Sequence, residues 1–542
     1  MSATSDAGTA TPTSMTGGEA MARQLRREGV EVIFGLPGDQ LMAALDALVD
    51  TPEIRYIVTR HEQGTTYMAD GYARATGRPG VAMVVPGVGV LNAAGGLATA
   101  YACSSPVLLL AGQVNRHGIG KDLGLLHDVH DQLDLVRPIT KWAERVLDPQ
   151  GIPAALREAF NQMNSGRPRP VEVEIPPEAF AESDLVTLID PVEVHPVGAD
   201  PDLVAKAADL LISSTTPLVI AGGGVVLGDA TEGLRQVVEL LQSPVVTTRE
   251  GKGAIDDRNP LSVGTAWVNR RLKPLIDSAD VVLAVGTRGQ GMGLTEGQKL
   301  IHLDVDPDQI GRNHPVDIAL AGDAQITLEA LVAALTERGI DRPSRTDEAK
   351  ATRAQVEEQL RAVGPQTHMV ELLRQAVPDD GILVCDTTTI AYMCHMRYPV
   401  YAPRTYFSTS YMGTLGFGFP ASLGVKVGRP DSPVVTVTGD GGFLFAATEL
   451  ATAVQHGINT VTVVFDDGAY GNSNRDQREK YHGRELGTLL RNPDWVAMAR
   501  SFGADGMKVD DVEKLPGAIA EALAADTPMV IAVPMDRMPS PF

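Results

Sequence analysis

Short hydrophobic runs alternate with longer amphipathic stretches along nearly the whole chain. The runs at 107–111, 281–285 and 434–438 are rich in Val, Leu and Thr and end at glycines or polar residues. Such runs are typical of strands buried on both faces of a parallel sheet. Because strand and helix patterns alternate, the sequence predicts an α/β fold of doubly wound domains with mostly parallel sheets.

Two polar stretches with prolines interrupt this alternation. One runs roughly over 185–201 (LVTLIDPVEVHPVGADP), and the other over 341–365, with a helical piece (EAKATRAQVEEQLRAV) between its proline-bearing ends. A chain of 542 residues is long enough for three domains of ordinary size. We therefore expect a disordered tail over 1–14 and three domains, over 15–185, 195–340 and 365–542.

The first and third of these domains share a pattern. In the first, YARATGRP leads into VAMVV and then PGVG; in the third, GVKVGRP leads into PVVTVT and then GDGG. Each pattern predicts a helix, a Gly-Arg-Pro turn, a strand and a glycine-rich loop. The sequence leaves two explanations open: a coincidence among common α/β turns, or two copies of one fold that face one another with the site between them.

The middle domain has its own strand followed by a glycine turn, at Gly222, Gly223 and Gly224. A glycine turn after a strand is weak support for a bound dinucleotide, because most such turns are only tight connections. We leave both interpretations open for this turn.

Two acidic motifs carry the strongest chemical signal. Gly439, Asp440, Gly441 and Gly442 follow the strand predicted at 434–438, and Asp467 follows the next strand, at 460–465, after a helix at 448–456. Both motifs then lie at the carboxyl ends of neighbouring parallel strands, where open α/β sheets bind ligands. Glycines let a phosphate approach the backbone, and two carboxylates facing it favour a hard cation, Mg²⁺. The alternative is a pair of ordinary turn aspartates.

Charge and cysteine content narrow the classes of partner. The formal net charge of −22 makes nucleic acids and anionic membranes poor partners. Cys103, Cys385 and Cys394 form neither a metal-ligand cluster nor a secreted disulfide framework, which fits a reducing cytoplasm. The first 15 residues lack the basic start and apolar core of a signal peptide. We expect a cytoplasmic protein.

One segment, 79–115, carries no ionised side chain and could be mistaken for a membrane span. Pro86, Pro106 and several glycines break it up before it reaches spanning length. We predict a strand, a loop, a helix and a strand there, all deeply buried.

Three further motifs, in order along the chain, carry a resemblance to a known family. They are Arg60-His61-Glu62-Gln63-Gly64 with the following MADGYAR, Gly413 to Ala421 (GTLGFGFPA), and GDG at 439–441 followed by DDGAYG at 466–471. On these motifs the chain resembles the thiamine-diphosphate-dependent enzymes, in the acetolactate synthase and pyruvate oxidase branch, over nearly all of 15–540. The resemblance implies three α/β domains: pyrimidine-binding, middle and diphosphate-binding.

The resemblance also implies a metal site. Asp440 and Asp467 would be the side-chain ligands of Mg²⁺, and the carbonyl of Ala469 would complete the protein's share. The chain departs from the family at Asp467, where Asn is usual, and so adds a negative charge beside the diphosphate. Mg²⁺ tolerates carboxylates, so we expect binding to survive with an altered pH dependence. Asp466 could be a solvated neighbour without a role.

Glu62 matches the glutamate that meets N1′ of the cofactor's aminopyrimidine in this family. In a dry site, desolvation raises the pKa of such a carboxyl, so proton and charge can be shared. The alternative for Glu62 is a surface glutamate that begins a helix. Glyoxylate carboligase is similar at 295–297 and 309–312 but lacks this glutamate, which argues against that activity here.

Other cofactor-binding positions follow from the same resemblance. Leu415 would bend the cofactor between its rings, and the carbonyl of Gly413 would accept a hydrogen bond from its amino group. Asp386 is interpreted as a helix cap rather than a phosphate contact. The remaining cofactor-binding candidates are the loop residue Pro37, the hydroxyls of Thr387 and Thr388, and Gly439, Gly441, Gly442, Tyr470 and Gly471.

The resemblance makes Gln113, His127 and His130, beside Glu62, the candidate catalytic residues near the substrate. Gln113 aligns with a glutamine of the cleft, and His130 occupies the aromatic position of the Asp-x-Phe-Gln-Glu pattern of acetolactate synthases. Histidines can pass protons near neutral pH, or they can be structural; both interpretations stay open. A zinc site at His127, Asp128 and His130 is not favoured, because the residues would lie on different helical faces.

The expected activity is the thiamine-diphosphate- and Mg²⁺-dependent decarboxylation of a small 2-oxo acid, with carboligation to an aldehyde or ketone. Three alternatives are a decarboxylase or lyase that releases an aldehyde, a flavin-coupled oxidase, and an inactive subunit. The presence of Glu62 and of both metal positions argues against the inactive subunit. Binding of FAD is left open and not favoured, because Gly286 to Gly291 (GTRGQG) replaces the usual flavin-contacting stretch. The resemblance implies a homodimer or homotetramer, with the cofactor between the first domain of one subunit and the third of another.

Overall fold

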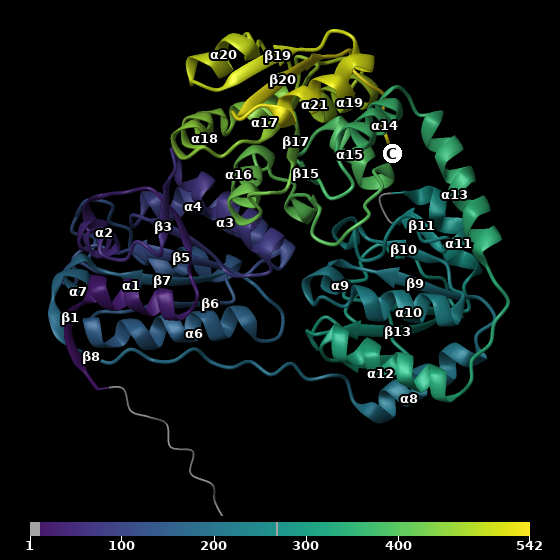
Figure 1. Ribbon diagram of the computed structural model, residues 1–542, viewed down its shortest axis with the longest axis horizontal. Helices are drawn as coiled ribbons and strands as arrows, with labels where there is room; N and C mark the ends of the chain where they lie inside the picture. Colours follow the sequence, from purple (N-terminus) through teal and green to yellow (C-terminus); the bar gives the residue numbers. More distant parts are fainter. Residues whose placement is uncertain (1–10, 267–268) are drawn as a thin grey trace, which may run out of the picture. The chain divides into compact units, whose positions relative to one another are not determined.

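The computed structural model describes residues 11–266 and 269–542 (Figure 1). It contains three six-stranded sheets in which every strand pairing is parallel, with helices between successive strands. This confirms the predicted fold class. The chain divides into two compact units: residues up to 73 together with 78–194, and 74–77 together with 195–542.

The first unit holds the sheet with strand order β3-β2-β4-β5-β7-β6. Helices α1, α2, α6 and α7 pack together on one face, and α4 packs against β4 and β5. The strands are β2 (Val32–Gly35), β3 (Arg55–Val58), β4 (Gly80–Val84), β5 (Val107–Gly112), β6 (Trp142–Arg145) and β7 (Val171–Ile175), and the helices are α1 (Gly17–Arg27), α2 (Met42–Val49), α3 (Glu62–Thr76), α4 (Val88–Cys103), α5 (Gln132–Val136), α6 (Ile152–Asn164) and α7 (Pro177–Ala181).

The amino-terminal end of this unit corrects the predicted tail. Residues 1–10 lie outside the described residues, but Thr13 and Ser14 belong to β1 (Thr13–Thr16), which pairs antiparallel with β8 (Ser183–Val186). Helix α1 then begins with a capping box, in which Thr16 Oγ1 accepts from the Glu19 N–H and the Glu19 carboxylate accepts from the Thr16 N–H. The strand pairing and this cap order the chain earlier than predicted.

The second unit begins with the sheet β11-β10-β9-β12-β13-β14. Helices α8, α10 and α12 pack on one face, and α11 and α13 pack on the other. The strands are β9 (Pro217–Ala221), β10 (Val245–Thr247), β11 (Ser262–Thr265), β12 (Val281–Val285), β13 (Lys299–Asp304) and β14 (Ile318–Ala321), and the helices are α8 (Pro201–Ser213), α9 (Gly223–Leu227), α10 (Thr231–Leu241), α11 (Lys273–Ser278), α12 (Ala324–Glu337) and α13 (Thr346–Arg361).

The glycine turn of this sheet lies where the strand order reverses, between β9 and β12. A Cβ on Gly222 would lie 2.2 Å from the Gly286 carbonyl oxygen, and a Cβ on Gly224 would lie 2.6 Å from the Gly286 Cα. The Gly224 N–H donates to the Gly286 carbonyl at 2.9 Å. Close backbone packing is therefore enough to explain the glycines at 222 and 224, as expected if the turn is only a tight connection.

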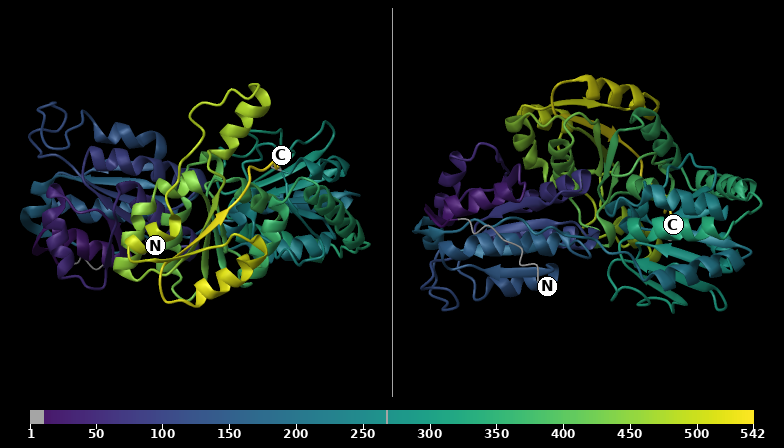
Figure 2. Two further views of the ribbon diagram at one scale, coloured as in Figure 1. Left: turned by 90° about the horizontal axis from the view of Figure 1, so that it is seen from above. Right: turned by 60° about the horizontal axis from the view of Figure 1, so that its bottom comes forward.

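The third sheet has the order β16-β15-β17-β18-β20-β19 and is enclosed by helices (Figure 2). Helices α14, α15 and α21 pack on one face, and α16 and α20 contact other parts of the sheet. The strands are β15 (Ile382–Cys385), β16 (Tyr406–Phe407), β17 (Val434–Gly439), β18 (Val461–Asp466), β19 (Asp505–Lys508) and β20 (Met529–Pro534), and the helices are α14 (Gln366–Ala376), α15 (Thr389–Arg397), α16 (Gly418–Gly428), α17 (Asp440–Leu444), α18 (Leu450–His456), α19 (Gly471–Lys480), α20 (Trp495–Ser501) and α21 (Leu515–Ala524).

The first and third sheets share one topology. Numbered in chain order within each sheet, their strands are arranged second, first, third, fourth, sixth, fifth in both. A coincidence between two common turns would not give six strands the same order in both sheets. The interpretation that the first and third domains repeat one fold is therefore confirmed. The middle sheet differs, with the order third, second, first, fourth, fifth, sixth.

The uncharged segment 79–115 forms β4, α4 and β5, which confirms the predicted strand, helix and strand. The expectation of deep burial is wrong for α4, because Val88 is 44% and Leu91 is 52% exposed. Within the described residues, no helix combines the length and the apolarity needed to cross a bilayer.

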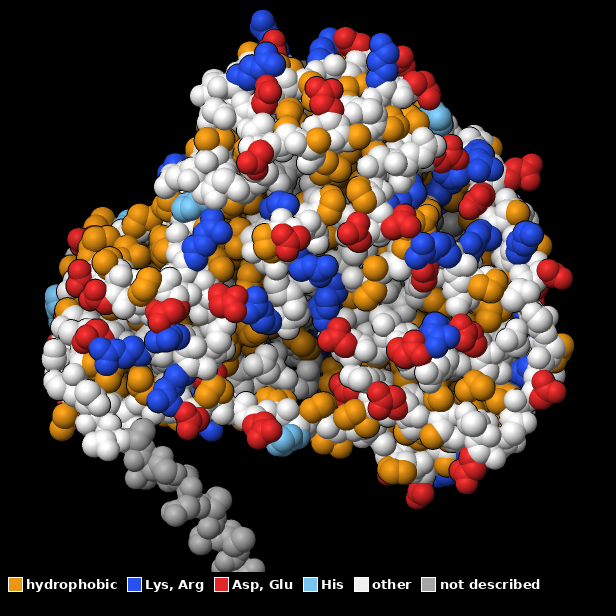
Figure 3. Space-filling view, in the orientation of Figure 1, with side chains coloured by type: hydrophobic (Ala, Val, Ile, Leu, Met, Phe, Trp, Pro, Cys, Tyr) orange, Lys and Arg blue, Asp and Glu red, His pale blue; other side chains and the backbone are white. Residues whose placement is uncertain are grey.

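The second predicted boundary carries α13, in agreement with the helical piece expected there. Ion pairs lie along it, from Arg345 to Glu348 and from Arg361 to Glu357. Figure 3 shows acidic and basic side chains interspersed over the face that includes α13. The limits of the three domains drawn from the sequence, 15–185, 195–340 and 365–542, stay predictions.

The close approach at Gly224 can be tested by adding a methyl group. Gly224→Ala forces the Cβ against the backbone of Gly286 and is expected to destabilise the protein by about 1–3 kcal/mol. The midpoint of thermal unfolding measures this. The matched control is Gly517→Ala in α21, where a Cβ would meet nothing within 4 Å, so a neutral or stabilising effect is expected. Equal midpoints for both variants would contradict the packing argument.

Candidate functional site

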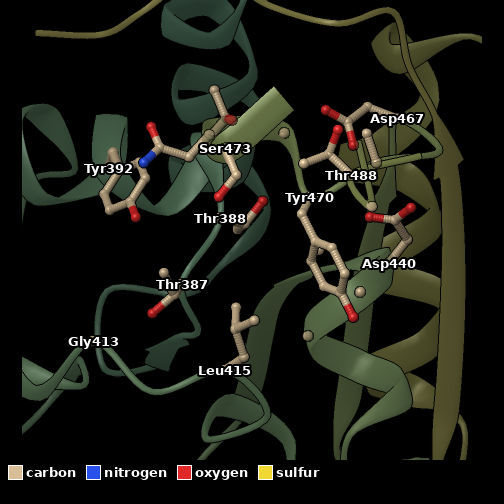
Figure 4. A pocket seen from close by; sticks show the side chains of 18 residues that line it. Thr387, Thr388, Tyr392, Gly413, Leu415, Asp440, Asp467, Tyr470, Ser473 and Thr488 are labelled. Atoms are coloured by element: carbon tan, nitrogen blue, oxygen red, sulfur yellow. The ribbon is translucent and has the colours of Figure 1, made fainter. Parts of the chain in front are cut away.

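A cavity of about 400 Å³ opens at the carboxyl ends of β15, β17 and β18 (Figure 4). Strands β15 and β17 are neighbours, yet their chain connections run to opposite sides of the sheet. Such a reversal is the switch point at which open α/β sheets bind ligands. The cavity is lined by Thr387, Thr388, Thr389, Tyr392, Gly413, Leu415, Gly439, Asp440, Gly441, Gly442, Asp467, Ala469, Tyr470, Gly471, Asn472, Ser473, Gly487 and Thr488.

Asp440 is the first residue of α17, directly after β17. Its side chain is only 2% exposed, and Oδ2 accepts a hydrogen bond from Asn492 Nδ2 at 2.7 Å. Burial raises the pKa of the Asp440 carboxyl above its ordinary value, although the bond from Asn492 opposes the shift. The charged form is therefore costly here unless a positive charge binds beside it.

Asp467 lies in the loop after β18, close to Asp440 on the same side of the cavity (Figure 4). Partial burial, followed by the nearby Asp440 charge, raises the pKa of Asp467 to about 6. Asp467 lies close to the start of α19, since a Cβ on Gly471 would lie 2.6 Å from Asp467 Oδ2. Two carboxylates that repel each other in one partly dry cavity fit a divalent cation with hard oxygen ligands.

Asp466 is not the solvated neighbour considered from the sequence. Its carboxylate accepts hydrogen bonds from Asn492 Nδ2 at 2.7 Å, Trp495 Nε1 at 2.6 Å and the Gly468 N–H at 3.1 Å. Asn492 thus bridges Asp466 and Asp440. Sequence reasoning missed Asn492 and Trp495, because nothing in the Asn-Pro-Asp-Trp turn indicates contact with motifs dozens of residues away.

The opposite wall is formed by Thr387 and Thr388, after β15 (Figure 4). Thr387 Oγ1 donates to the Thr414 carbonyl at 3.2 Å, which ties this wall to the loop that carries Gly413 and Leu415. Leu415 reaches the cavity from that loop, with Gly413 before it in a left-handed conformation at φ +63°. The conformation at 413 favours glycine.

Asp386 is not the cap of the helix that follows it, because Thr388 occupies the N-cap of α15. The Asp386 carboxylate accepts instead from the Gly418 N–H at 3.0 Å, at the start of α16, and from the Thr387 N–H at 2.7 Å. Burial raises the pKa of Asp386 to about 6. This side chain therefore caps the start of α16, not the helix that follows it, and holds together two connections that frame the cavity.

Glu62 belongs to the first unit and begins α3, directly after β3. It is 7% exposed, and its Oε2 accepts from Asn92 Nδ2 at 3.0 Å. The alternative of a surface glutamate is therefore wrong. A Cβ on Gly89 would lie 3.7 Å from Glu62 Cγ, so Glu62 lies beside the loop after β4.

Pro37 lies in the loop after β2, at the point where the order of the first sheet reverses. The next residue, Gly38, packs so closely that a Cβ would lie 2.1 Å from Val85 Cγ1. The loops after β2 and β4 therefore meet at the switch point of this sheet, as the loops after β15 and β17 do in the other unit. Glu62 therefore lies near the switch point of the first sheet, which is the position equivalent to the cavity of the third sheet.

Gln113 is buried just after β5, and both ends of its amide are engaged. Nε2 donates to Glu174 Oε1 at 3.1 Å, and Oε1 accepts from the Val114 N–H at 2.6 Å. Gln132, which sequence reasoning did not single out, donates to Glu174 Oε2 at 2.8 Å and accepts from the Gly87 N–H at 2.8 Å. These bonds hold the loop after β4 in place.

The two candidate histidines, His127 and His130, lie in different local environments. His130 is exposed and lies 3.0 Å from an Asp122 carboxylate oxygen, and His127 has a positive φ of +68°. The segment 120–131 is not helical, so the helical-face argument against zinc is wrong. Among the described residues, however, no group of three or more His, Cys, Asp or Glu side chains is arranged to hold a metal ion.

The cavity of the second unit thus brings together every site residue predicted after residue 380. Pro37, Glu62, Gln113, His127 and His130 belong to the first unit. The catalytic and ligand-binding roles assigned to all of these residues stay predictions.

Comparison with known proteins gives one consistent result. Residues 15–136, 204–331 and 386–533 match the N-terminal TPP binding domain, the central domain and the C-terminal TPP binding domain described for thiamine pyrophosphate enzymes. A probable acetolactate synthase large subunit of Methanocaldococcus jannaschii is 34% identical, over 96% of this chain and 92% of its own length.

Two other relatives carry two different names, one a decarboxylase and the other again an acetolactate synthase. A probable 2-ketoarginine decarboxylase of Pseudomonas aeruginosa is 34% identical, over 93% of this chain and 91% of its own length. The acetolactate synthase isozyme 3 large subunit of Escherichia coli K12 is 31% identical, over 94% of this chain and 92% of its own length. The similarity extends over all three sheets in each case.

The raised pKa of Asp467 predicts how the metal-free protein responds to pH. Its pKa of about 6, against an ordinary 3.8, means that its contribution to stability is present below about pH 4 and lost as the pH rises through 6. Asp467→Asn should therefore stabilise the protein at a pH of about 7.5, with little effect at about 4.5. For a fully buried carboxyl, this pKa shift would correspond to about 3 kcal/mol of unfolding free energy. Because Asp467 is partly exposed, solvent screening reduces the expected gain to the order of 1 kcal/mol.

Thermal unfolding in the presence of a chelator measures this effect. The control is Asp466→Asn, which disturbs a carboxylate that accepts three hydrogen bonds and is expected to lower the unfolding midpoint. If Asp467→Asn also lowered the midpoint at the higher pH, the proposed repulsion would be refuted.

Proposed function

This chain belongs to the thiamine pyrophosphate enzymes, and we propose that it decarboxylates a small 2-oxo acid and joins the remaining fragment to an aldehyde or ketone. The acidic cavity at the switch point of the third sheet carries this proposal, together with acetolactate synthase relatives that match nearly the whole chain. Thiamine diphosphate, when bound, supplies the electron sink for cleaving the bond to the carboxylate.

We propose that Mg²⁺ binds between Asp440, Asp467 and the carbonyl of Ala469. The support is chemical: two carboxylates with raised pKa values and a third oxygen-bearing residue line one cavity. Asn492 donates to one oxygen of Asp440 and so helps to fix the orientation of this carboxylate. The glycines at 439, 441 and 442 leave room for phosphate oxygens beside this pair.

The roles of the remaining residues follow from their burial and position. Glu62, held by Asn92, would keep and return a proton at its carboxyl in a site shielded from water. Leu415 would orient the bound cofactor, and Thr387 and Thr388 would donate to its phosphates. Gln113, His127 and His130 remain candidates for contact with the substrate.

We propose that Glu62 of a second copy completes the site, in a homodimer or homotetramer. The support is the family match on both sides of the pairing, over 15–136 and 386–533. A cytoplasmic location is consistent with the burial of the cysteines at 103, 385 and 394. FAD remains unfavoured, since the glycine turn after β9 is used in packing.

A decarboxylase that releases an aldehyde is the second candidate. The relative named as a probable 2-ketoarginine decarboxylase is as similar to this chain as the first acetolactate synthase. The exposed His130, paired with Asp122, stands where acetolactate synthases carry an aromatic residue. A polar substrate side chain would suit such a surface better than the methyl group of pyruvate does.

Product analysis separates the two candidates. Purified protein is incubated with thiamine diphosphate, Mg²⁺, and pyruvate, longer 2-oxo acids or 2-oxo acids that carry a guanidinium group, with and without added aldehydes. We expect carboligation products in mass spectra. Aldehyde without carboligation would favour the second candidate, and no turnover of any 2-oxo acid would reject both.

Two variants separate cofactor binding from chemistry. Glu62→Gln should lower turnover by about 100-fold to 10,000-fold, because the amide cannot hold the proton, while the cofactor still binds. Asp440→Ala should abolish Mg²⁺-dependent cofactor binding, because one carboxylate of the metal pair is lost.

Steady-state kinetics and calorimetric titration with thiamine diphosphate provide the two measurements. The control is Glu53→Gln, which breaks only an exposed ion pair with Arg26 and should leave both quantities unchanged. Native turnover in Glu62→Gln would remove Glu62 from the mechanism.

A further inference from the structure

One end of the acidic cavity is lined by hydrogen-bond donors instead of carboxylates. We call it the donor end, and it consists of Tyr392, Asn472 and Ser473. Figure 4 shows Tyr392 and Ser473 on the side of the cavity away from Asp440 and Asp467, the two acidic residues of the lining. The donor end therefore has a chemistry of its own within the same cavity.

The hydroxyls of the donor end are open to the cavity and not engaged by the rest of the described chain. Ser473 is exposed and Tyr392 is half-buried, and neither hydroxyl forms a hydrogen bond with a described residue. The first turn of α19, which begins at Gly471, contains no acidic residue, and its N-cap, Tyr470, supplies no side-chain acceptor. Both hydroxyls can therefore donate to a ligand.

A buried arginine orients the third side chain of the donor end. Arg475, one turn further along α19, is 5% exposed, and its Nη2 donates to Asn472 Oδ1. A guanidinium only donates hydrogen bonds, so the atom of the Asn472 amide that faces it must be the oxygen. Asn472 is itself exposed, and its two N–H donors bond to no described residue. They are left for an acceptor in the cavity.

The charge of Arg475 is not neutralised by a carboxylate. None of the described acidic side chains forms an ion pair with it, although it is almost wholly buried. Burial raises the pKa of Tyr392, and the positive charges of Arg249 and Arg475 oppose this rise, so both cations act on the donor end. Of these two, Arg249 is paired with Glu250 at 3.3 Å. Because a buried cation without a partner is costly, the Arg475 charge favours an anion at the donor end.

The position of the donor end indicates which anion it takes. Figure 4 shows Leu415, the residue proposed above to orient the cofactor, on the far side of the cavity from Ser473. Asn472 follows the loop that carries Asp467, so the donor end begins where the proposed metal pair ends. A cofactor that extends from Leu415 past the metal pair would bring its outermost phosphate to the donor end. That phosphate has three free oxygens for three donor side chains.

We propose that the donor end binds the terminal phosphate of thiamine diphosphate, and that Arg475 is a positioning residue that presents the amide donors of Asn472 to it. This inference rests on the proposed function, because it requires the cofactor to occupy the acidic cavity. The Asn472 amide and the two hydroxyls donate to phosphate oxygens, and the Arg475 charge strengthens the amide bond by polarising the amide. The donor end thereby selects the diphosphate over thiamine monophosphate, which has no second phosphate to place there.

Binding measurements, which do not depend on turnover, test the selectivity. Thiamine diphosphate and thiamine monophosphate are titrated separately into the full chain with Mg²⁺ in a calorimeter. Asn472→Asp keeps an acceptor for Arg475 but replaces the amide donors by a negative charge. Its affinity for the diphosphate should fall about tenfold or more, and its affinity for the monophosphate by less than about threefold. The matched control is Asn164→Asp, which adds the same charge at an exposed position in the first unit and should bind both compounds as the native chain does.

A double-variant cycle tests the positioning role of Arg475. Arg475→Gln should lower the affinity for thiamine diphosphate several-fold in the native chain, but have little further effect in an Asn472→Ala background, because the amide that Arg475 orients is then absent. A merely structural arginine would lower the affinity equally in both backgrounds. The control is Arg23→Gln, which breaks only an exposed ion pair with Glu19 and should leave the affinity unchanged.

The outcomes separate this inference from the proposed function. If the native chain does not bind thiamine diphosphate, the proposed function fails and this inference fails with it. If the native chain binds it, but Asn472→Asp keeps native affinity or loses affinity equally for both compounds, this inference alone is overturned. Additive losses in the Arg475 and Asn472 cycle would remove the positioning role from Arg475.

Discussion

The repulsion between Asp440 and Asp467 is the constraint on which the first cavity depends. Each carboxyl is carried on the end of a different parallel strand, and burial raises the pKa of both; the charge of Asp440 raises that of Asp467 further. Asn492 and Trp495 hold the adjoining carboxylates in place from a distant turn. The fold therefore stores a destabilising pair of charges that a hard cation would relieve, which is an ordinary way for a protein to prepare a metal site.

The same strand order in the first and third sheets gives this arrangement a counterpart. In both sheets the order reverses between the first and third strands in the chain, and loops after those strands carry glycines that pack tightly. In the third sheet the reversal carries Asp386, Thr387 and Asp440; in the first it carries Gly38 and Gly87, with Glu62 beside them. One topology thus presents the two aspartates of the proposed metal site in one copy and the buried Glu62 in the other.

Helix α15 extends from the acidic cavity to a second cavity of the same unit. It begins at Thr389, which lines the acidic cavity, and ends at Arg397, which lines a cavity of about 230 Å³ together with Lys252 and Asp257. Nine residues of α-helix span roughly 13 Å.

The sequence by itself determined the fold class and the main acidic motifs. Alternating hydrophobic runs predicted parallel sheets, and Asp440 and Asp467 could be placed at strand ends because strand periodicity and glycine loops are local properties of the chain. The same local signals led to an error at Thr13 and Ser14, whose strand pairs with β8. They also did not reveal which helix Asp386 caps, because its partner at Gly418 lies 32 residues away.

Only the tertiary structure decided contacts between distant segments. Asn492 bridging two aspartates, Gln132 holding Gly87, and Lys252 meeting Tyr398 and Arg397 in one cavity have no local signature. Hydrophobic patterning specifies which face of each element is buried, but it does not specify which polar atoms meet at loops. Those meetings depend on how the strands are ordered in each sheet, and on which buried donors find an acceptor there.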